Sequence, residues 1–95
     1  MSNMRFEAEA RRLRLAGAIV DADLVTLRDA IESFSADAAR HVMVDLTRVT
    51  ELAPTAARYL LDVKAVLEAQ GRRMTLLRLL DSPTDLAIRH ASRRR

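Results

Sequence analysis

One hydroxyl, that of Thr55, is placed where it could accept a phosphate or meet a partner protein. Residues 42–61 read as a buried strand, a short loop and a helix that begins at Pro54. In the first turn of a helix the amide groups point outward, and the helix dipole favours negative charge. The helix would therefore tolerate a phosphate on Thr55, which adds about −1.5 to −2 charge at pH 7. The alternative is an ordinary first-turn threonine that helps to satisfy those amides.

The helix expected over residues 54–70 has two distinguishable faces. An apolar stripe with helical spacing should face the sheet, and it consists of Ala56, Leu60, Val63 and Leu67. Thr55, Arg58 and Asp62 fall on a different side, and the last two are spaced for an ion pair. Tyr59 lies near the border, where it could belong to a binding interface or pack over the edge of the core.

The remaining polar candidates give a weak case for catalysis. Asp21 is expected to cap a helix, Asp23 to add charge to its first turn, and Asp45 to end a strand near Thr55 or point to solvent. Metal sites with oxygen ligands need several convergent groups in a suitable loop, so we expect no metal. His41 is expected at a strand start and His90 in a mobile tail. With no glycine-rich phosphate loop, we expect no catalytic residue, no cofactor and no small-molecule substrate.

Periodicity predicts strands that alternate with helices along the chain. The expected strands cover residues 6–10, 13–15, 42–46 and 74–79, and the expected helices cover residues 21–37, 54–70 and 84–91. The run over residues 42–46 is apolar apart from Asp45, which is typical of a central strand covered on both faces. The order β-β-α-β-α-β-α indicates an α/β fold with parallel strand pairs and right-handed crossovers.

Composition limits the classes of protein that fit. Ninety-five residues form one domain, and 49% hydrophobic residues exclude a disordered chain. No apolar run is long enough for a transmembrane segment, and the N-terminus lacks a signal peptide, so a cytoplasmic protein is expected. The net charge of +3 comes from arginines at positions 89, 93, 94 and 95, since residues 1–88 carry twelve basic and thirteen acidic residues. We therefore expect residues 89–95 to be a frayed basic tail, and nucleic-acid binding is disfavoured.

Four segments of the chain carry a family resemblance, namely Leu13-Arg14-Leu15-Ala16-Gly17, Leu24 with Leu27-Arg28, His41 through Thr50, and Gly71 through Leu76. In these segments the chain resembles the STAS family, which includes anti-sigma-factor antagonists and the tails of sulfate transporters. The resemblance covers roughly residues 5–85, and the central strand-to-helix piece is its most specific part. The family's loop Asp-Ser-Ser-Gly, whose second serine is the usual phosphoacceptor, falls on Ala53, Pro54, Thr55 and Ala56. Of the side chains in that loop, this chain keeps the hydroxyl, which Thr55 supplies. Val20 occupies a second position of the family that is normally acidic.

The resemblance implies a STAS-like mixed sheet of about four strands with three helices, and a protein-binding role in transcription regulation. The implied partner is an anti-sigma factor that is also a serine/threonine kinase, and Thr55 is the candidate phosphoacceptor. The candidate partner-binding residues are Ala53, Pro54, Thr55, Arg58, Tyr59, Asp62 and Asp21. A constitutive form that is never phosphorylated is one variant of this role. Two alternatives stand beside it. One is a structural STAS subunit of a lipid-transport ABC complex that contacts the ATPase subunit through residues 54–70; the other is a nucleic-acid binder that uses the tail.

Overall fold

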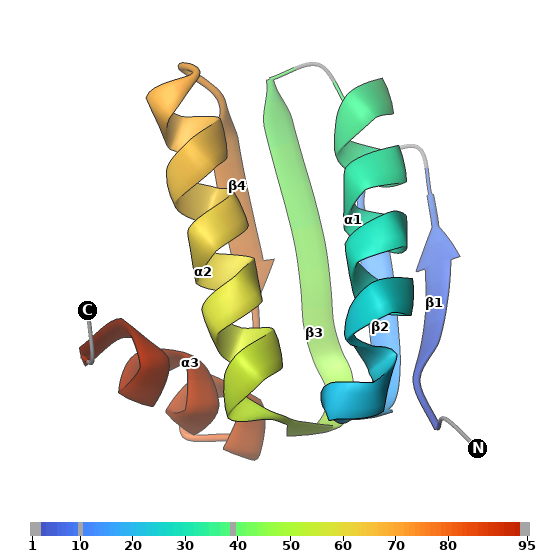
Figure 1. Cartoon of the computed structure of the whole chain (residues 1–95), viewed down its shortest axis with the longest axis vertical. Helices are drawn as coiled ribbons and strands as arrows, with labels where there is room; N and C mark the ends of the chain where they lie inside the picture. Colours follow the sequence, from blue (N-terminus) through green and yellow to red (C-terminus); the bar gives the residue numbers. More distant parts are fainter. Residues whose placement is uncertain (1–2, 10, 39, 94–95) are drawn as a thin grey trace.

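The computed structural model describes residues 3–9, 11–38 and 40–93 and has the α/β architecture expected from the sequence (Figure 1). The elements are β1 (Arg5–Ala8), β2 (Leu13–Ile19), a 3-10 turn (Asp21–Asp23), α1 (Leu24–Asp37), β3 (His41–Leu52), α2 (Pro54–Ala69), β4 (Arg73–Leu77) and α3 (Pro83–Arg93). The sheet order is β1-β2-β3-β4. β1 is antiparallel to β2, whereas the β2–β3 and β3–β4 pairs are parallel. The predicted class and the order β-β-α-β-α-β-α are confirmed.

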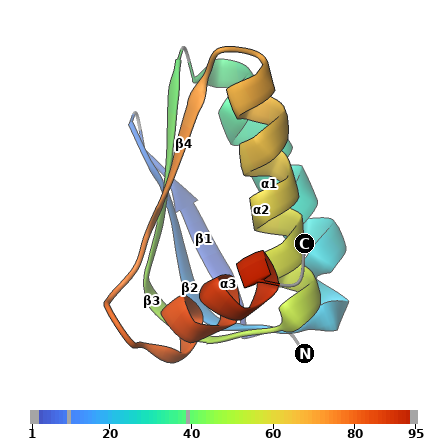
Figure 2. The same ribbon diagram turned by 90° about the vertical axis from the view of Figure 1, so that its left-hand side faces the viewer.

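The two long helices cover one face of the sheet and leave the other face open (Figure 2). The prediction that the central strand is covered on both faces was therefore wrong for the described part of the chain. In β3, Val42, Val44 and Leu46 belong to the core, while Asp45 is buried between Arg12 and Arg14, with which it forms ion pairs. Because helices cover only one face of the described sheet, charged residues such as Arg14 and Asp45 can occupy its open face.

Strand β3 is longer than the expected run over residues 42–46, because the loop predicted after it continues the pairing with β2. Arg48 aligns with Ala16, and Leu52 aligns with Ile19, across two register shifts. Each shift inserts an extra residue on β3, as a bulge does, and so breaks the regular alternation by which a strand is recognised.

Most large apolar side chains pack between the sheet and helices α1 and α2. Those that are almost completely buried are Leu13, Leu15, Ile19, Leu27, Ile31, Val42, Val44, Leu46 and Leu60. Ala56 and Ala57 are also fully buried, which lets the first turn of α2 lie close to the strands. This close packing fixes the position of Thr55, the residue between Pro54 and Ala56.

Two glycines end or bend the elements that frame the sheet. Gly71 has φ +76° and closes α2, because its amide and that of Arg72 donate to the carbonyls of Glu68 and Leu67 at 3.0 and 2.9 Å. Gly17 has φ +83° inside β2, and a Cβ there would collide with the carbonyl oxygen of Asn3. Gly17 thus permits the chain before β1 to cross β2 at close range.

Helix α3 closes one end of the layered structure and packs against α2 and β3 (Figure 2). Its Thr84 hydroxyl donates to the carbonyl of Val49 at 3.2 Å. The helix extends to Arg93, past the expected end at residue 91, so residues 89–93, which were also expected to fray as a tail, are helical. The last two arginines lie outside the described residues. Arg89 pairs with Asp81 at 2.8 Å and with Asp85 at 3.4 Å.

Candidate functional site

The carboxyl ends of β2 and β3 bring together two segments that are far apart in sequence. The amide of Ala53 donates to the carbonyl of Ile19 at 2.8 Å, and this bond joins the residue before α2 to the last residue of β2. Because β2 and β3 are parallel, the residues that follow them emerge at the same edge of the sheet. Asp21 follows the first strand and Thr55 follows the second, so both lie at this edge.

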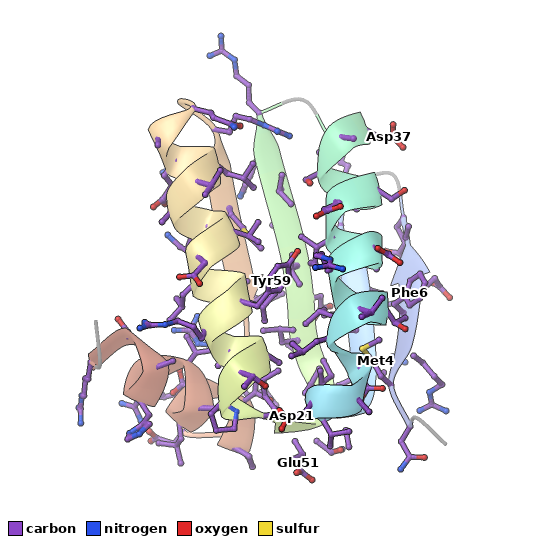
Figure 3. All side chains as sticks on the ribbon, viewed as in Figure 1. Met4, Phe6, Asp21, Asp37, Glu51 and Tyr59 are labelled. Atoms are coloured by element: carbon purple, nitrogen blue, oxygen red, sulfur yellow. The ribbon has the colours of Figure 1, made fainter. Side chains whose placement is uncertain are left out.

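At this edge the hydroxyl of Thr55 donates a hydrogen bond to the carboxylate of Asp21. Both residues are exposed, and Figure 3 shows Asp21 beside the first turn of α2. The prediction that Asp21 caps the first helix was wrong. It is Asp23, two residues later, whose carboxylate accepts the amide of Val20 at 2.8 Å and closes the 3-10 turn before α1.

An open groove runs from Thr55 toward α3. It has a volume of about 460 Å³ and is lined by Pro54, Thr55, Arg58, Ala87, His90 and Ala91. The guanidinium of Arg58 reaches across it and donates to the carbonyl of Ala91 at 3.5 Å. Among the described residues, Arg58 forms no ion pair with Asp62, so the pair expected from their spacing is not seen. A positive charge therefore borders the groove next to the threonine.

The two other residues predicted on this helix lie apart from the groove. Tyr59 points toward α1 (Figure 3), is partly buried and packs against the core. Its hydroxyl is buried without a hydrogen-bond partner in the described structure. Burial of this hydroxyl, together with the nearby carboxylate of Glu32, raises the pKa of Tyr59. Asp62 is exposed on the next turn of α2. The structure thus shows Tyr59 in packing contacts, and a role for it in an interface stays a prediction.

His90 is the residue of the groove that the sequence analysis missed. It was expected in a mobile tail, but it lies in α3 on the side that faces Thr55 and Arg58. The helix expected over residues 84–91 already included this position, because Ala87, Ile88 and Ala91 continue its apolar spacing up to and past His90. The other histidine, His41, lies at the start of β3 as expected, with its ring nitrogen 2.7 Å from the hydroxyl of Thr75.

Asp45 lies in the middle of β3 and not near Thr55. Its carboxylate accepts hydrogen bonds from the amide and the hydroxyl of Thr47, at 2.9 and 2.7 Å. It also lies 3.6 Å from the guanidinium of Arg12 and 3.7 Å from that of Arg14. Burial acts to raise the pKa of Asp45, but these hydrogen bonds and positive charges outweigh burial and hold the pKa below its ordinary value. Asp45 is therefore a structural anion of the open sheet face.

The described part of the chain offers neither a metal cluster nor a membrane span. Over residues 3–9, 11–38 and 40–93, no three His, Asp or Glu side chains gather in a way that could hold a metal ion. No helix in those ranges combines the length and the apolar character needed to cross a membrane. The groups gathered around Thr55 are the hydroxyl of Thr55 itself, the carboxylate of Asp21, the guanidinium of Arg58 and the imidazole of His90.

Comparison with known proteins identifies the family of this chain. The family model described as "Mlab, STAS domain" matches residues 2–90. A solved structure described as "Crystal Structure Analysis of Mglu" is similar with a TM-score of 0.61 and 22% sequence identity, over 82% of this chain and 20% of that chain. The present chain thus spans about a fifth of that protein, and the likeness shows a shared fold. No curated protein matches the sequence.

Proposed function

The chain belongs to the STAS domain family, and from this premise we propose that it is a protein-binding regulatory domain whose docking face is the Thr55 edge. STAS domains are typically non-catalytic binding domains. The Thr55 edge consists of Ala53, Pro54 and Thr55 at the start of α2, together with Asp21 and the groove residues Arg58 and His90. The observation that carries the proposal is the exposed hydrogen bond from Thr55 to Asp21 at the end of this groove.

In this proposal the partner is an anti-sigma factor that is also a serine/threonine kinase. A phosphate on Thr55 would remove the proton that the hydroxyl donates to Asp21 and would place two negative groups side by side. Arg58, three residues later on the same helix, offers a positive charge toward which the phosphate could turn. Phosphorylation would thus convert a face of mixed charge into an acidic one and end binding.

A second candidate is a structural STAS subunit of a lipid-transport ABC complex, which would hold the ATPase subunit with the same face. The bond to Asp21 is also compatible with this role, because a hydroxyl already held by a carboxylate suits a fixed contact as well as it suits a switch. The description of the matching family, which names Mlab, is consistent with this candidate. In this case Thr55 stays unmodified.

A pull-down from native lysate, read by mass spectrometry, tests the proposal and separates the two partners. The bait is the wild-type chain, with Thr55→Asp as the test variant and Ser33→Asp as the matched control. Ser33 is exposed on α1 and lines the groove between α1 and β1, not the groove beside Thr55. An ATP-binding kinase lost with Thr55→Asp and kept with Ser33→Asp supports the regulatory role. Transporter ATPase and permease subunits support the structural role. Equal recovery of a partner by all three baits would remove the Thr55 edge from consideration.

A further inference from the structure

The outer side of β1 pairs with no other strand of the described sheet. β1 is the first strand in the order β1-β2-β3-β4, and all four of its residues are exposed, including Phe6 at 50%. Natural sheets often protect such an edge with a proline, a bulge, charged side chains, a covering loop or a very short strand. The strand Arg5-Phe6-Glu7-Ala8 is short and carries two charges, but it has no proline, and its pairing with β2 has no register shift. An edge of this kind is suited to pair with another strand.

The hydrogen-bond phase of the β1–β2 pair determines which backbone groups face outward. The amide of Glu9 donates to the carbonyl of Arg12 at 2.9 Å, so these two residues form a hydrogen-bonded pair. Because such pairs alternate in an antiparallel ladder, Glu7 and Arg5 also direct their backbone groups at β2. Phe6 and Ala8 therefore present their amides and carbonyls at the outer edge.

Side chains of β1 alternate between the two faces of the sheet. Arg5 and Glu7 lie on the open face, beside Ala16 and Arg14 of β2. Phe6 lies on the helix-covered face and lines the groove between β1 and α1 (Figure 3). Among the described residues, neither Arg5 nor Glu7 takes part in an ion pair. One positive and one negative charge, two residues apart, thus lie without an ion-pair partner along the outer edge of the described sheet.

We propose that two copies of this chain associate through antiparallel pairing of their β1 edges, with Phe6 opposite Phe6 of the second copy. In this register the outward amides and carbonyls of the two Phe6 residues bond to each other. Arg5 of each copy then lies opposite Glu7 of the other, in the non-hydrogen-bonded pairs where side chains approach most closely. The two aromatic rings meet on the helix-covered face, and the sheets join into one.

The charges select this register over its neighbours. A slip of the pairing by one residue would turn side chains to the wrong face, so the allowed alternatives differ by two. Pairing centred on Glu7 would place the two Glu7 carboxylates opposite each other, and pairing centred on Arg5 would do the same to the guanidinium groups. Like charges directly opposite are destabilising. Pairing centred on Phe6 is the register of these three that matches opposite charges.

The proposed dimer does not depend on the function proposed above. β1 forms one lateral edge of the sheet, and α2 lies toward the opposite lateral edge (Figure 1). A dimer joined through β1 leaves the Thr55 edge of both copies accessible. Since the strand has four residues, the interface falls in the small class below ~1,200 Å² that is usual for transient complexes. The dimer should therefore form reversibly and depend on protein concentration.

Sedimentation equilibrium over a range of protein concentrations tests the proposal with charge variants. Arg5→Glu turns each facing pair of positions 5 and 7 into two carboxylates, and Glu7→Arg turns each pair into two guanidinium groups. Each single variant should weaken self-association at least tenfold. The double variant R5E/E7R restores opposite charges and should dimerise like the wild type. An equimolar mixture of the two single variants should form a heterodimer, because positions 5 and 7 are then both acidic in one chain and both basic in the other.

The matched control is Arg28→Glu, which makes the same charge change at an exposed position of α1 near Tyr59 of α2, away from β1. It should leave self-association unchanged, and circular dichroism verifies the fold of every variant. A wild-type chain that stays monomeric at all concentrations overturns the proposal. So does a dimer that persists in Arg5→Glu, or one that the double variant and the mixture fail to restore.

Discussion

The hydroxyl of Thr55 and the carboxylate of Asp21 are joined by a hydrogen bond across 34 residues of sequence, at the edge where two parallel strands end. This contact links the turn that opens α1 to the turn that opens α2. It is formed by side chains that remain exposed, so it holds a surface in shape without adding to the core. Its strength and its response to charge can be measured separately.

The Thr55–Asp21 bond should contribute modestly to stability. Thr55→Val keeps the shape of the side chain and removes the donor, while Asp21→Ala removes the acceptor. Each change should lower the free energy of unfolding in urea by about 0.5–1 kcal/mol, since exposed hydrogen bonds to charged groups compete with water. The double variant should cost less than the sum of the two single variants. Additive losses would show that the contact is not formed in solution.

A negative charge at position 55 should weaken partner binding through Asp21. Thr55→Asp mimics the charge of a phosphate in part and places a carboxylate beside the carboxylate of Asp21. We expect at least a tenfold loss of affinity for the partner, measured by calorimetry, with little change in circular dichroism. Asp21→Asn in the same chain removes the like-charge repulsion and should recover part of the loss. If Asp21→Asn has no effect on the affinity of Thr55→Asp, the introduced charge acts on the partner alone.

The buried hydroxyl of Tyr59 should be dispensable for folding. It has no hydrogen-bond partner in the described structure, so Tyr59→Phe removes a buried polar group without breaking a contact. The free energy of unfolding should stay equal or rise by up to about 1 kcal/mol. Tyr59→Ala also removes a ring that packs against the core, and it should destabilise the chain by about 2–4 kcal/mol. A loss of stability in Tyr59→Phe would indicate a partner for the hydroxyl, such as an ordered water.

Much of the fold could be predicted from the sequence because its signals are local. The spacing of Leu24, Leu27, Ile31 and Phe34 marks α1, and Pro54 and Gly71 mark the two ends of α2. The extent of β3 could not be predicted, because residues 47–52 join the sheet through bulges. Bulges depend on the partner strand and not on the periodicity of the strand itself.

The candidate site was predicted in part, for a similar reason. Thr55 at the start of α2 follows from Pro54, a local signal. The role of Asp21 does not, since an aspartate near a helix start is equally suited to cap the helix. What decides between the two roles is the close approach of the β2 and β3 ends, a long-range contact. His90 was missed because it was assigned to the basic tail, although the helix expected over residues 84–91 includes it.

The two glycines should differ in their tolerance of a side chain. Both have positive φ, so alanine at either position incurs the left-handed penalty of about 1–2 kcal/mol. At Gly71 nothing lies within 4 Å of the added Cβ, and the loss should stop there. At Gly17 the Cβ would collide with a backbone carbonyl, so Gly17→Ala should cost clearly more than Gly71→Ala in urea unfolding. Equal losses in the two variants would mean that the chain before β1 moves aside.

The lowered pKa of Asp45 should make the stability of the chain sensitive to acid. The folded state holds this carboxylate ionised, whereas the unfolded chain binds its proton near an ordinary pKa of about 3.9. Since the unfolded state then binds more protons, the contribution is fully present above the unfolded pKa and is lost as the pH falls through the folded pKa. Urea unfolding between pH 2 and pH 6 should show this decline, with a smaller slope in Asp45→Asn.

Two further carboxylate contacts separate the contribution of Asp45 from that of its neighbours. Thr47→Val, which removes one hydrogen bond to the carboxylate, should reduce the slope in the same direction but by less. Asp85, whose pKa is lowered by the amide of Asp81 and by Arg78, should account for a slope that persists in Asp45→Asn. An unchanged slope in Asp45→Asn would mean that the pKa of Asp45 is the same in the folded and unfolded chains. The acid sensitivity would then come from other carboxylates.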